Sequence, residues 1–223
     1  MKGFGDLYKS ENKKNKKTKS SKEQILNQAI KFHLKGNIPE AKKYYEYCIS
    51  QGFNDHIVFS NYGIILKKLG KLEEAEFSYR KAIEIKPDLA DTHYNLGNIL
   101  RGLGKLEEAE FSYRKAIAIK PDLADAHYNL GKLLNNLGKL QDAELPYRKA
   151  IEIKPDYTNA HYNLGNLLND VGKLKDAELS YRKAIEIKPD FAEAHSNLGS
   201  ILKDLGKLKE AELSTRKAIA IKP

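Results

Sequence analysis

The chain has 223 residues, and its 39 Lys and Arg against 30 Asp and Glu give a net charge of +9 at pH 7. Its single cysteine, Cys48, cannot form an intramolecular disulfide, so the composition does not indicate an oxidising compartment. No apolar run approaches the length of a membrane span, and no hydrophobic segment follows the N-terminal lysines as a secretory signal requires. We therefore expect a cytoplasmic protein without a membrane anchor.

Residues 1–22 are a low-complexity basic segment. They contain eight Lys against Asp6 and Glu11, which accounts for +6 of the net charge of +9. The few apolar residues cannot offset the entropy lost on ordering, so we expect a disordered tail. Such a tail can bind nucleic acid or an acidic membrane, or it can serve only to keep the protein soluble, and we favour the second interpretation.

From residue 56 onward the sequence repeats every 34 residues. The tetrapeptide Tyr94–Gly97 recurs at Tyr128–Gly131 and at Tyr162–Gly165, and five repeats follow one another without an insertion or deletion. A fixed period of this size predicts stacked supersecondary elements rather than a single globular core.

Each repeat carries two apolar stripes with helical spacing. In the repeat over 90–123 the first stripe comprises His93, Leu96, Gly97 and Leu100, and the second comprises Ala109, Tyr113, Ala116 and Ile117. Gly104 is expected to end the first helix in the left-handed conformation, and Pro121 ends the second. Asp122 and Asp125 are spaced as a capping box for the next helix. Glu110 and Arg114, four residues apart on the second helix, are expected to form an ion pair, as are their equivalents in the other regular repeats.

The spacing of six residues resembles the tetratricopeptide repeat (TPR) family; they are Leu96, Gly97, Ala109, Tyr113, Ala116 and Pro121. The resemblance implies an all-α fold, a right-handed α-solenoid (superhelix) of TPR helix-turn-helix repeats. His93 departs from the family pattern, which usually has Trp or another large apolar residue at this position.

The period divides the chain into a tail and six repeats. They are a disordered basic tail over 1–22, a divergent N-terminal capping repeat over 23–55, regular repeats over 56–89, 90–123, 124–157 and 158–191, and a last repeat over 192–223 that lacks a C-terminal capping helix. The outer face of the last repeat would lie open. Either the sequence is the front of a longer protein, or this face pairs with another copy in a homo-oligomer.

The sixth position of every repeat is Asn, on the arc of the first helix that faces away from the apolar stripe. The six residues are Asn27, Asn61, Asn95, Asn129, Asn163 and Asn197. This pattern resembles the asparagine ladder in the TPR region of O-linked N-acetylglucosamine transferases, which implies solvent-facing amides that grip a peptide backbone. A carboxamide supplies the donor and the acceptor that a peptide unit needs. Duplication of one ancestral repeat explains the ladder equally well.

Further residues on the same arc would line the groove; they are Tyr94, Tyr128, Tyr162, Asn98 and Asn166. The remaining side chains there carry both signs of charge, which argues against a nucleic-acid ligand. We therefore expect a protein or peptide ligand.

Catalytic signatures are absent from the sequence, which has no phosphate loop, no Cys-x-x-Cys and no nucleophile elbow. Four repeated histidines are spaced too far apart to share a metal, and we expect them to be packed or bonded to the backbone; they are His93, His127, His161 and His195. The sequence thus predicts a non-catalytic scaffold, without cofactor or metal, that binds a peptide segment in the concave groove of a TPR array. The alternative is the substrate-recruiting N-terminal region of a larger enzyme such as a glycosyltransferase.

Overall fold

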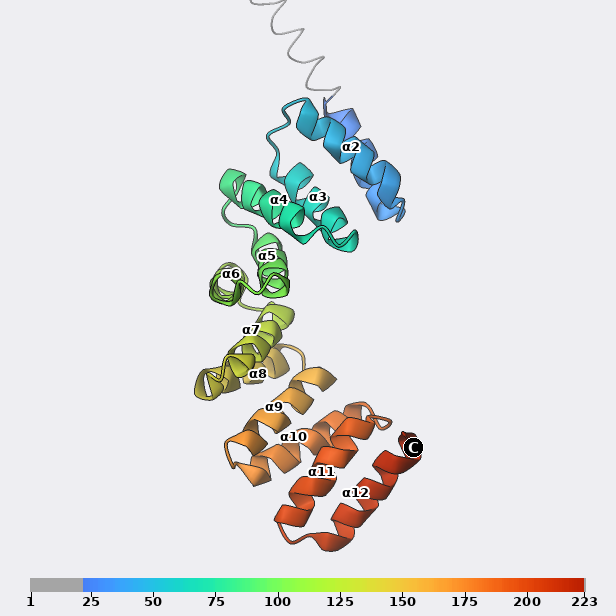
Figure 1. Cartoon of the computed structure of the whole chain (residues 1–223), viewed down its shortest axis with the longest axis vertical. Helices are drawn as coiled ribbons and strands as arrows, with labels where there is room; N and C mark the ends of the chain where they lie inside the picture. Colours follow the sequence, from blue (N-terminus) through green and yellow to red (C-terminus); the bar gives the residue numbers. More distant parts are fainter. Residues whose placement is uncertain (1–21, 223) are drawn as a thin grey trace, which may run out of the picture. The chain divides into compact units, whose positions relative to one another are not determined.

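The computed structural model describes residues 22–222, and this part of the chain contains helices and no strand (Figure 1). A helix over residues 22–34 comes first. The helices that follow are α2 (Ile38–Ser50), α3 (His56–Lys68), α4 (Leu72–Ile85), α5 (Ala90–Gly102), α6 (Leu106–Ile119), α7 (Ala124–Asn136), α8 (Leu140–Ile153), α9 (Thr158–Asp170), α10 (Leu174–Ile187), α11 (Ala192–Asp204) and α12 (Leu208–Ile221). The fold is the all-α solenoid of helix-turn-helix repeats that the sequence predicts.

The expected disordered tail lies outside the described residues, except for its last residue. Lys22 belongs to the helix over residues 22–34, and its Nζ lies 4.8 Å from the centre of the Phe53 ring.

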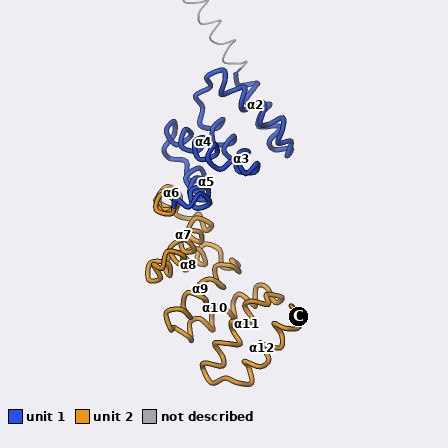
Figure 2. Tube along the Cα trace, in the orientation of Figure 1, with its two compact units in different colours: residues 1–105 blue, residues 106–223 orange. Residues whose placement is uncertain are grey.

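The chain divides into two compact units, residues 1–105 and residues 106–223 (Figure 2). The division falls inside the repeat over 90–123, between α5 and α6. Within each unit a first helix packs on the second helix of its own repeat, as α7 does on α8, and that second helix packs on the first helix of the next repeat, as α8 does on α9. First helices also contact one another, in the pairs α3 with α5, α7 with α9 and α9 with α11.

The turn inside each regular repeat has the predicted glycine cap. Gly104 follows α5 with a φ of +76°, and the equivalent Gly70, Gly138, Gly172 and Gly206 share this conformation. The N–H of the following residue, Lys105, donates back to the carbonyl oxygen of Leu100 at 2.9 Å. A residue with a Cβ rarely adopts this backbone conformation, which explains why Gly recurs at this place.

The predicted capping box is wrong. The N-cap of α7 is Leu123, which makes no side-chain hydrogen bond to the helix. The Asp125 carboxylate instead accepts a hydrogen bond from the Tyr157 hydroxyl at 2.8 Å. Asp125 still lies in the first turn of α7, where a negative charge is favourable beside the helix dipole.

In three of the regular repeats a glycine of the first helix packs against a tyrosine of the second, Gly63 with Tyr79, Gly131 with Tyr147 and Gly165 with Tyr181, whereas in the last repeat Gly199 faces Thr215. A Cβ placed on Gly165 would lie 2.7 Å from Cε1 of Tyr181, closer than van der Waals contact allows. Gly131 faces Tyr147 in the same way, with a shortest distance of 3.0 Å. The tyrosine ring therefore occupies the space that the missing side chain leaves, and a larger residue would have to displace it.

Ion pairs join successive repeats as well as successive turns. The predicted pairs within second helices are confirmed, for example Arg182 Nη2 to Glu178 Oε1 at 2.9 Å. The sequence analysis missed a second cation on the same glutamate, Lys207 Nζ at 2.7 Å from Glu178 Oε2, which comes from the next repeat. The same inter-repeat pair recurs between Lys105 and Glu76, Lys139 and Glu110, and Lys173 and Glu144.

The outer face of the last helix, α12, carries two exposed apolar side chains. Leu208 and Ile219 are 65% and 60% exposed, more than their half-buried equivalents in the preceding repeats. Leu213, at 67%, is as exposed as its equivalents Leu145 and Leu179 and does not belong to the open face. Burial of this face by a further element or by another copy stays a prediction.

Candidate functional site

The six asparagines of the ladder lie at equivalent places on first helices. Asn27 is exposed on the helix over residues 22–34, and the other five, Asn61, Asn95, Asn129, Asn163 and Asn197, are half-buried. They are thus less open to solvent than the sequence analysis expected, because amides of this ladder bond to neighbouring repeats. Asn163 Nδ2 donates to the Tyr128 hydroxyl at 3.0 Å, and Asn197 Nδ2 donates to the Tyr162 hydroxyl at 3.2 Å.

The predicted groove tyrosines, Tyr94, Tyr128 and Tyr162, are half-buried too. The rings of Tyr128 and Tyr157 are 4.9 Å apart between centroids, and those of Tyr162 and Phe191 are 4.8 Å apart. The sequence analysis missed Tyr157 and Phe191. The signal was the large apolar or aromatic residue that precedes each first helix of the regular array from α5 onward. These contacts fix the tyrosine rings before any ligand binds.

Asn166 connects the ladder to the core. Its Oδ1 accepts hydrogen bonds from the buried Tyr181 hydroxyl at 2.8 Å and from Asn197 Nδ2 at 2.9 Å. Burial raises the pKa of the Tyr181 hydroxyl, and the same hydroxyl is also hydrogen-bonded to the Asn197 amide. Asn98, the equivalent residue on α5, is also half-buried.

A polar hollow of about 380 Å³ lies along the first helices of the second unit. Its lining residues are Asn135, Asn166, Asn169, Asp170, Tyr181, Asn197, Ser200 and Ile201. Two of these, Asn166 and Asn197, belong to the predicted site, and the structure adds Asn135, Asn169 and Ser200 from α7, α9 and α11. Ser200 occupies the ninth position of its repeat, on the predicted polar arc, whereas Asn135 and Asn169 occupy the twelfth position, just beside that arc. No Lys or Arg lines the hollow, and side-chain amides dominate it.

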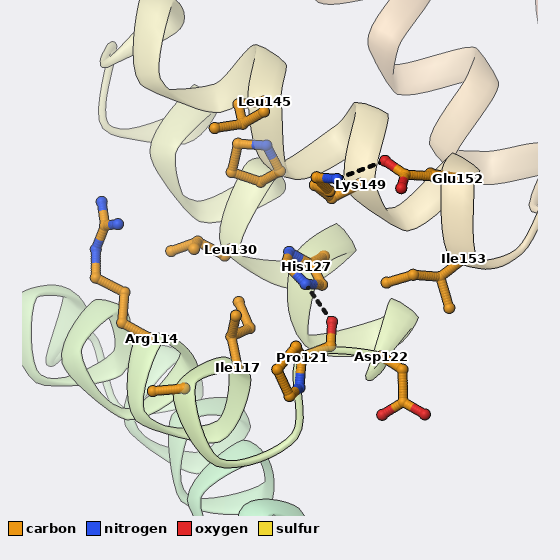
Figure 3. A pocket seen from close by; sticks show the side chains of 12 residues that line it. Arg114, Ile117, Pro121, Asp122, His127, Leu130, Leu145, Lys149, Glu152 and Ile153 are labelled. Atoms are coloured by element: carbon orange, nitrogen blue, oxygen red, sulfur yellow. Dashed lines mark hydrogen bonds and ion pairs between the residues drawn. The ribbon is translucent and has the colours of Figure 1, made fainter.

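A larger hollow of about 670 Å³ lies between α6 and α8 of the same unit, and its lining is mostly apolar (Figure 3). Ile117, Leu130, Leu145 and Ile153 face it, together with the aliphatic stems of charged residues. The sequence analysis did not predict this hollow, because it compared repeats one by one and the hollow forms between two second helices.

The four repeated histidines are bonded to the backbone, as expected. His127 Nε2 donates to the Pro121 carbonyl oxygen at 2.9 Å, at the edge of the apolar hollow (Figure 3). The same bond joins His93 to Pro87, His161 to Pro155 and His195 to Pro189, at 2.9–3.0 Å. Each histidine thus fixes the turn that enters its own helix. In residues 22–222 no three metal-ligating side chains gather into a cluster.

None of the described helices combines the length and the apolar character needed to cross a bilayer.

Comparison with known proteins identifies the family. Sequence profiles described as TPR repeat match residues 63–101, 97–138 and 165–206, and profiles described as tetratricopeptide repeat match 124–157, 147–178 and 192–223. The chain therefore belongs to the tetratricopeptide repeat family. A search of curated proteins gave no match.

Solved structures share this fold. The crystal structure of YrrB, described as a TPR protein with an unusual peptide-binding site, is 27% identical with a TM-score of 0.72 and covers 80% of this chain and 92% of YrrB. The crystal structure of MamA is 27% identical with a TM-score of 0.69 and covers 71% of this chain and 93% of MamA. PilF of Pseudomonas aeruginosa, at 16% identity and a TM-score of 0.73 over 88% of this chain and 89% of its own, shares the fold alone.

Proposed function

We propose that the chain is a non-catalytic scaffold that binds an extended peptide segment along the polar arc of its first helices. The observation that carries this proposal is the amide-lined hollow of the second unit, to which α7, α9 and α11 all contribute. The description of YrrB as a protein with a peptide-binding site supports the same class of ligand.

The chemistry of the hollow suits a polypeptide main chain. Each carboxamide offers a donor and an acceptor, and peptide N–H and C=O groups need both. Adjacent helices lie about 8–10 Å apart and an extended peptide advances about 3.3 Å per residue, so successive first helices would meet about every third residue. The absence of Lys and Arg from the lining disfavours a phosphate backbone.

The alternative, a substrate-recruiting region of a larger glycosyltransferase-like enzyme, rests on the resemblance of the asparagine ladder to that of O-linked N-acetylglucosamine transferases. It uses the same groove and the same peptide chemistry. The two functions differ in whether a catalytic domain belongs to the same protein, so both share one test of the groove.

The test is selection of peptides from a random library by the purified chain, followed by measurement of Kd for the selected sequences. Ser200→Arg places a long charged side chain in the polar hollow, since Ser200 is exposed on α11 and lines it. Leu179→Arg is the matched control, because Leu179 on α10 is 66% exposed and lies outside the lining of the hollow.

We expect Ser200→Arg to weaken binding by more than about tenfold, a loss of about 1.4 kcal/mol, while Leu179→Arg binds as the original chain does. Equal affinity for all three proteins would show that the ligand binds elsewhere. Circular dichroism of each variant verifies that the helices are retained.

A further inference from the structure

We propose that Tyr181 is a positioning residue whose buried hydroxyl fixes the orientation of the Asn166 and Asn197 amides, so that this subsite offers a peptide one donor and one acceptor in a set order. The inference rests on the proposed function of the groove and deepens it, because it assigns a direction to the bound peptide. It follows from counting the hydrogen bonds that each amide makes within the protein.

The Asn166 carbonyl oxygen is fully used inside the protein. An amide oxygen has two lone pairs. Asn166 Oδ1 accepts from Tyr181 Oη at 2.8 Å and from Asn197 Nδ2 at 2.9 Å. Tyr181 is 1% exposed, and its hydroxyl is hydrogen-bonded to the Asn197 amide and donates its own hydrogen to Asn166. The amide of Asn166 therefore points its oxygen toward the core in this arrangement.

The Asn197 amide nitrogen is fully used as well. It donates to Asn166 Oδ1 at 2.9 Å and to the Tyr162 hydroxyl at 3.2 Å, and the Asn197 amide is also hydrogen-bonded to the Tyr181 hydroxyl. The orientation of Asn166 therefore determines that of Asn197, since an oxygen of Asn197 could not take the place of this donor. One buried hydroxyl thus orients amides on two successive first helices.

Two groups remain for a ligand. Asn166 Nδ2 donates to no described residue and Asn197 Oδ1 accepts from none, and both half-buried residues line the polar hollow. In an extended peptide the N–H and the C=O of one residue point to the same side. The C=O of such a residue would accept a hydrogen bond from Asn166 Nδ2, and its N–H would donate to Asn197 Oδ1. Because N–H precedes C=O along a chain, the peptide would run from α11 toward α9, opposite to the order of the repeats.

The chain contains its own control. Tyr147 on α8 is equivalent to Tyr181 and is also 1% exposed, but the residue at the place of Asn166 in that repeat is Lys132, which has no amide to orient. Tyr147→Phe and Tyr181→Phe thus remove the same atom from equivalent buried positions, and only the second should affect amide orientation.

The first measurement needs no ligand. Hydrogen exchange of side-chain amides, followed by NMR, should show the Asn197 Nδ2 protons protected and those of Asn166 exchanging faster. Tyr181→Phe should abolish or invert this difference, and Tyr147→Phe should leave it unchanged. Identical protection in Tyr181→Phe and the original chain would overturn the inference without touching the proposed function.

The second measurement uses a peptide selected by the chain and a set of derivatives, each N-methylated at a single residue. One N-methyl group that removes the N–H facing Asn197 should weaken binding roughly tenfold, the effect of about one hydrogen bond. In Tyr181→Phe this penalty should fall to that of neighbouring positions, whereas a purely structural role for Tyr181 would lower the affinity for all derivatives equally.

A nitroxide at the peptide N-terminus should broaden resonances of α11 more than those of α7, and the reverse pattern would refute the assigned direction. If the original chain selects no peptide, the proposed function fails, whatever the amide exchange shows.

Discussion

The imidazole of His161 donates through Nε2 to the carbonyl oxygen of Pro155 at 2.9 Å, across the turn that joins one repeat to the next. The His161 side chain is buried, at 8% exposure. The bond therefore satisfies a backbone acceptor just beyond the end of a helix, where carbonyls lack helical partners. A polar residue at this core position thus has a structural task that a large apolar residue would not perform.

Replacement of His161 should reveal this bond in the stability of the chain. His161→Leu leaves the Pro155 carbonyl without its donor, and we expect the free energy of unfolding in urea to fall by about 1–2 kcal/mol. His56→Leu is the control, because His56 is half-buried at the start of α3 and makes no bond of this kind. A similar loss in both variants would show that the effect comes from removing an imidazole and not from the bond.

Gly165 and Gly102 should respond to alanine with opposite signs. A Cβ on Gly165 would lie 2.7 Å from the buried Tyr181 ring, so Gly165→Ala should destabilise by about 1–3 kcal/mol through overpacking. A Cβ on the exposed Gly102 would lie 3.5 Å from Leu72, so Gly102→Ala should be neutral or slightly stabilising, because alanine loses less entropy in a helix. Thermal unfolding measures both, and a Tm for Gly165→Ala at or above that of the original chain would contradict the packing described here.

The ion pair between repeats predicts a pH dependence. Lys207 holds the pKa of the Glu178 carboxyl below its ordinary value of 4.5, burial opposes this, and Arg182 adds to it. A depressed carboxylate pKa stabilises the fold above pH 4.5, and this stabilisation is lost as the pH falls through the lower pKa of the folded state. Glu178→Gln should therefore cost about 1 kcal/mol at pH 7, a modest value because Lys207 is 43% exposed. The cost should shrink as the pH falls below 4.5 and disappear below the lower pKa of the folded state.

Glu212 provides the comparison for Glu178. It occupies the same position in the last repeat and pairs with Arg216, but its side chain is 61% exposed. Urea unfolding of Glu212→Gln should change little at any pH. If Glu178→Gln shows the same small change at pH 7, the inter-repeat pair contributes nothing measurable.

The period of the sequence was sufficient to predict the fold, because each repeat carries the same apolar stripes and the same glycine cap. Gly104 had to cap a helix, and Gly165 had to admit the ring of Tyr181. The wrong prediction, the capping box at Asp122 and Asp125, came from placing the start of the helix one residue too early. The N-cap is Leu123, and an apolar N-cap without a side-chain hydrogen bond also precedes α5 and α11.

The candidate site was harder to predict, because its side chains make contacts with the neighbouring repeat that the sequence of one repeat does not show. A helical wheel places Asn163 and Asn197 on a polar arc but does not show what lies across from them in the next repeat. The Tyr128 and Tyr162 hydroxyls take donors that the sequence analysis assigned to a ligand. The apolar hollow between α6 and α8 also depends on two repeats at once, so no single repeat predicts it.

The most direct test of the central claim is NMR titration of the chain with a selected peptide, following backbone amides and the side-chain amides of Asn135, Asn166 and Asn197. We predict that the shifts change along α7, α9 and α11, with the side-chain amides among the largest changes, while exposed residues of α8 and α10 stay as they were. Changes confined to Ile117, Leu145 and Ile153, around the apolar hollow, would place the ligand between second helices and contradict the account.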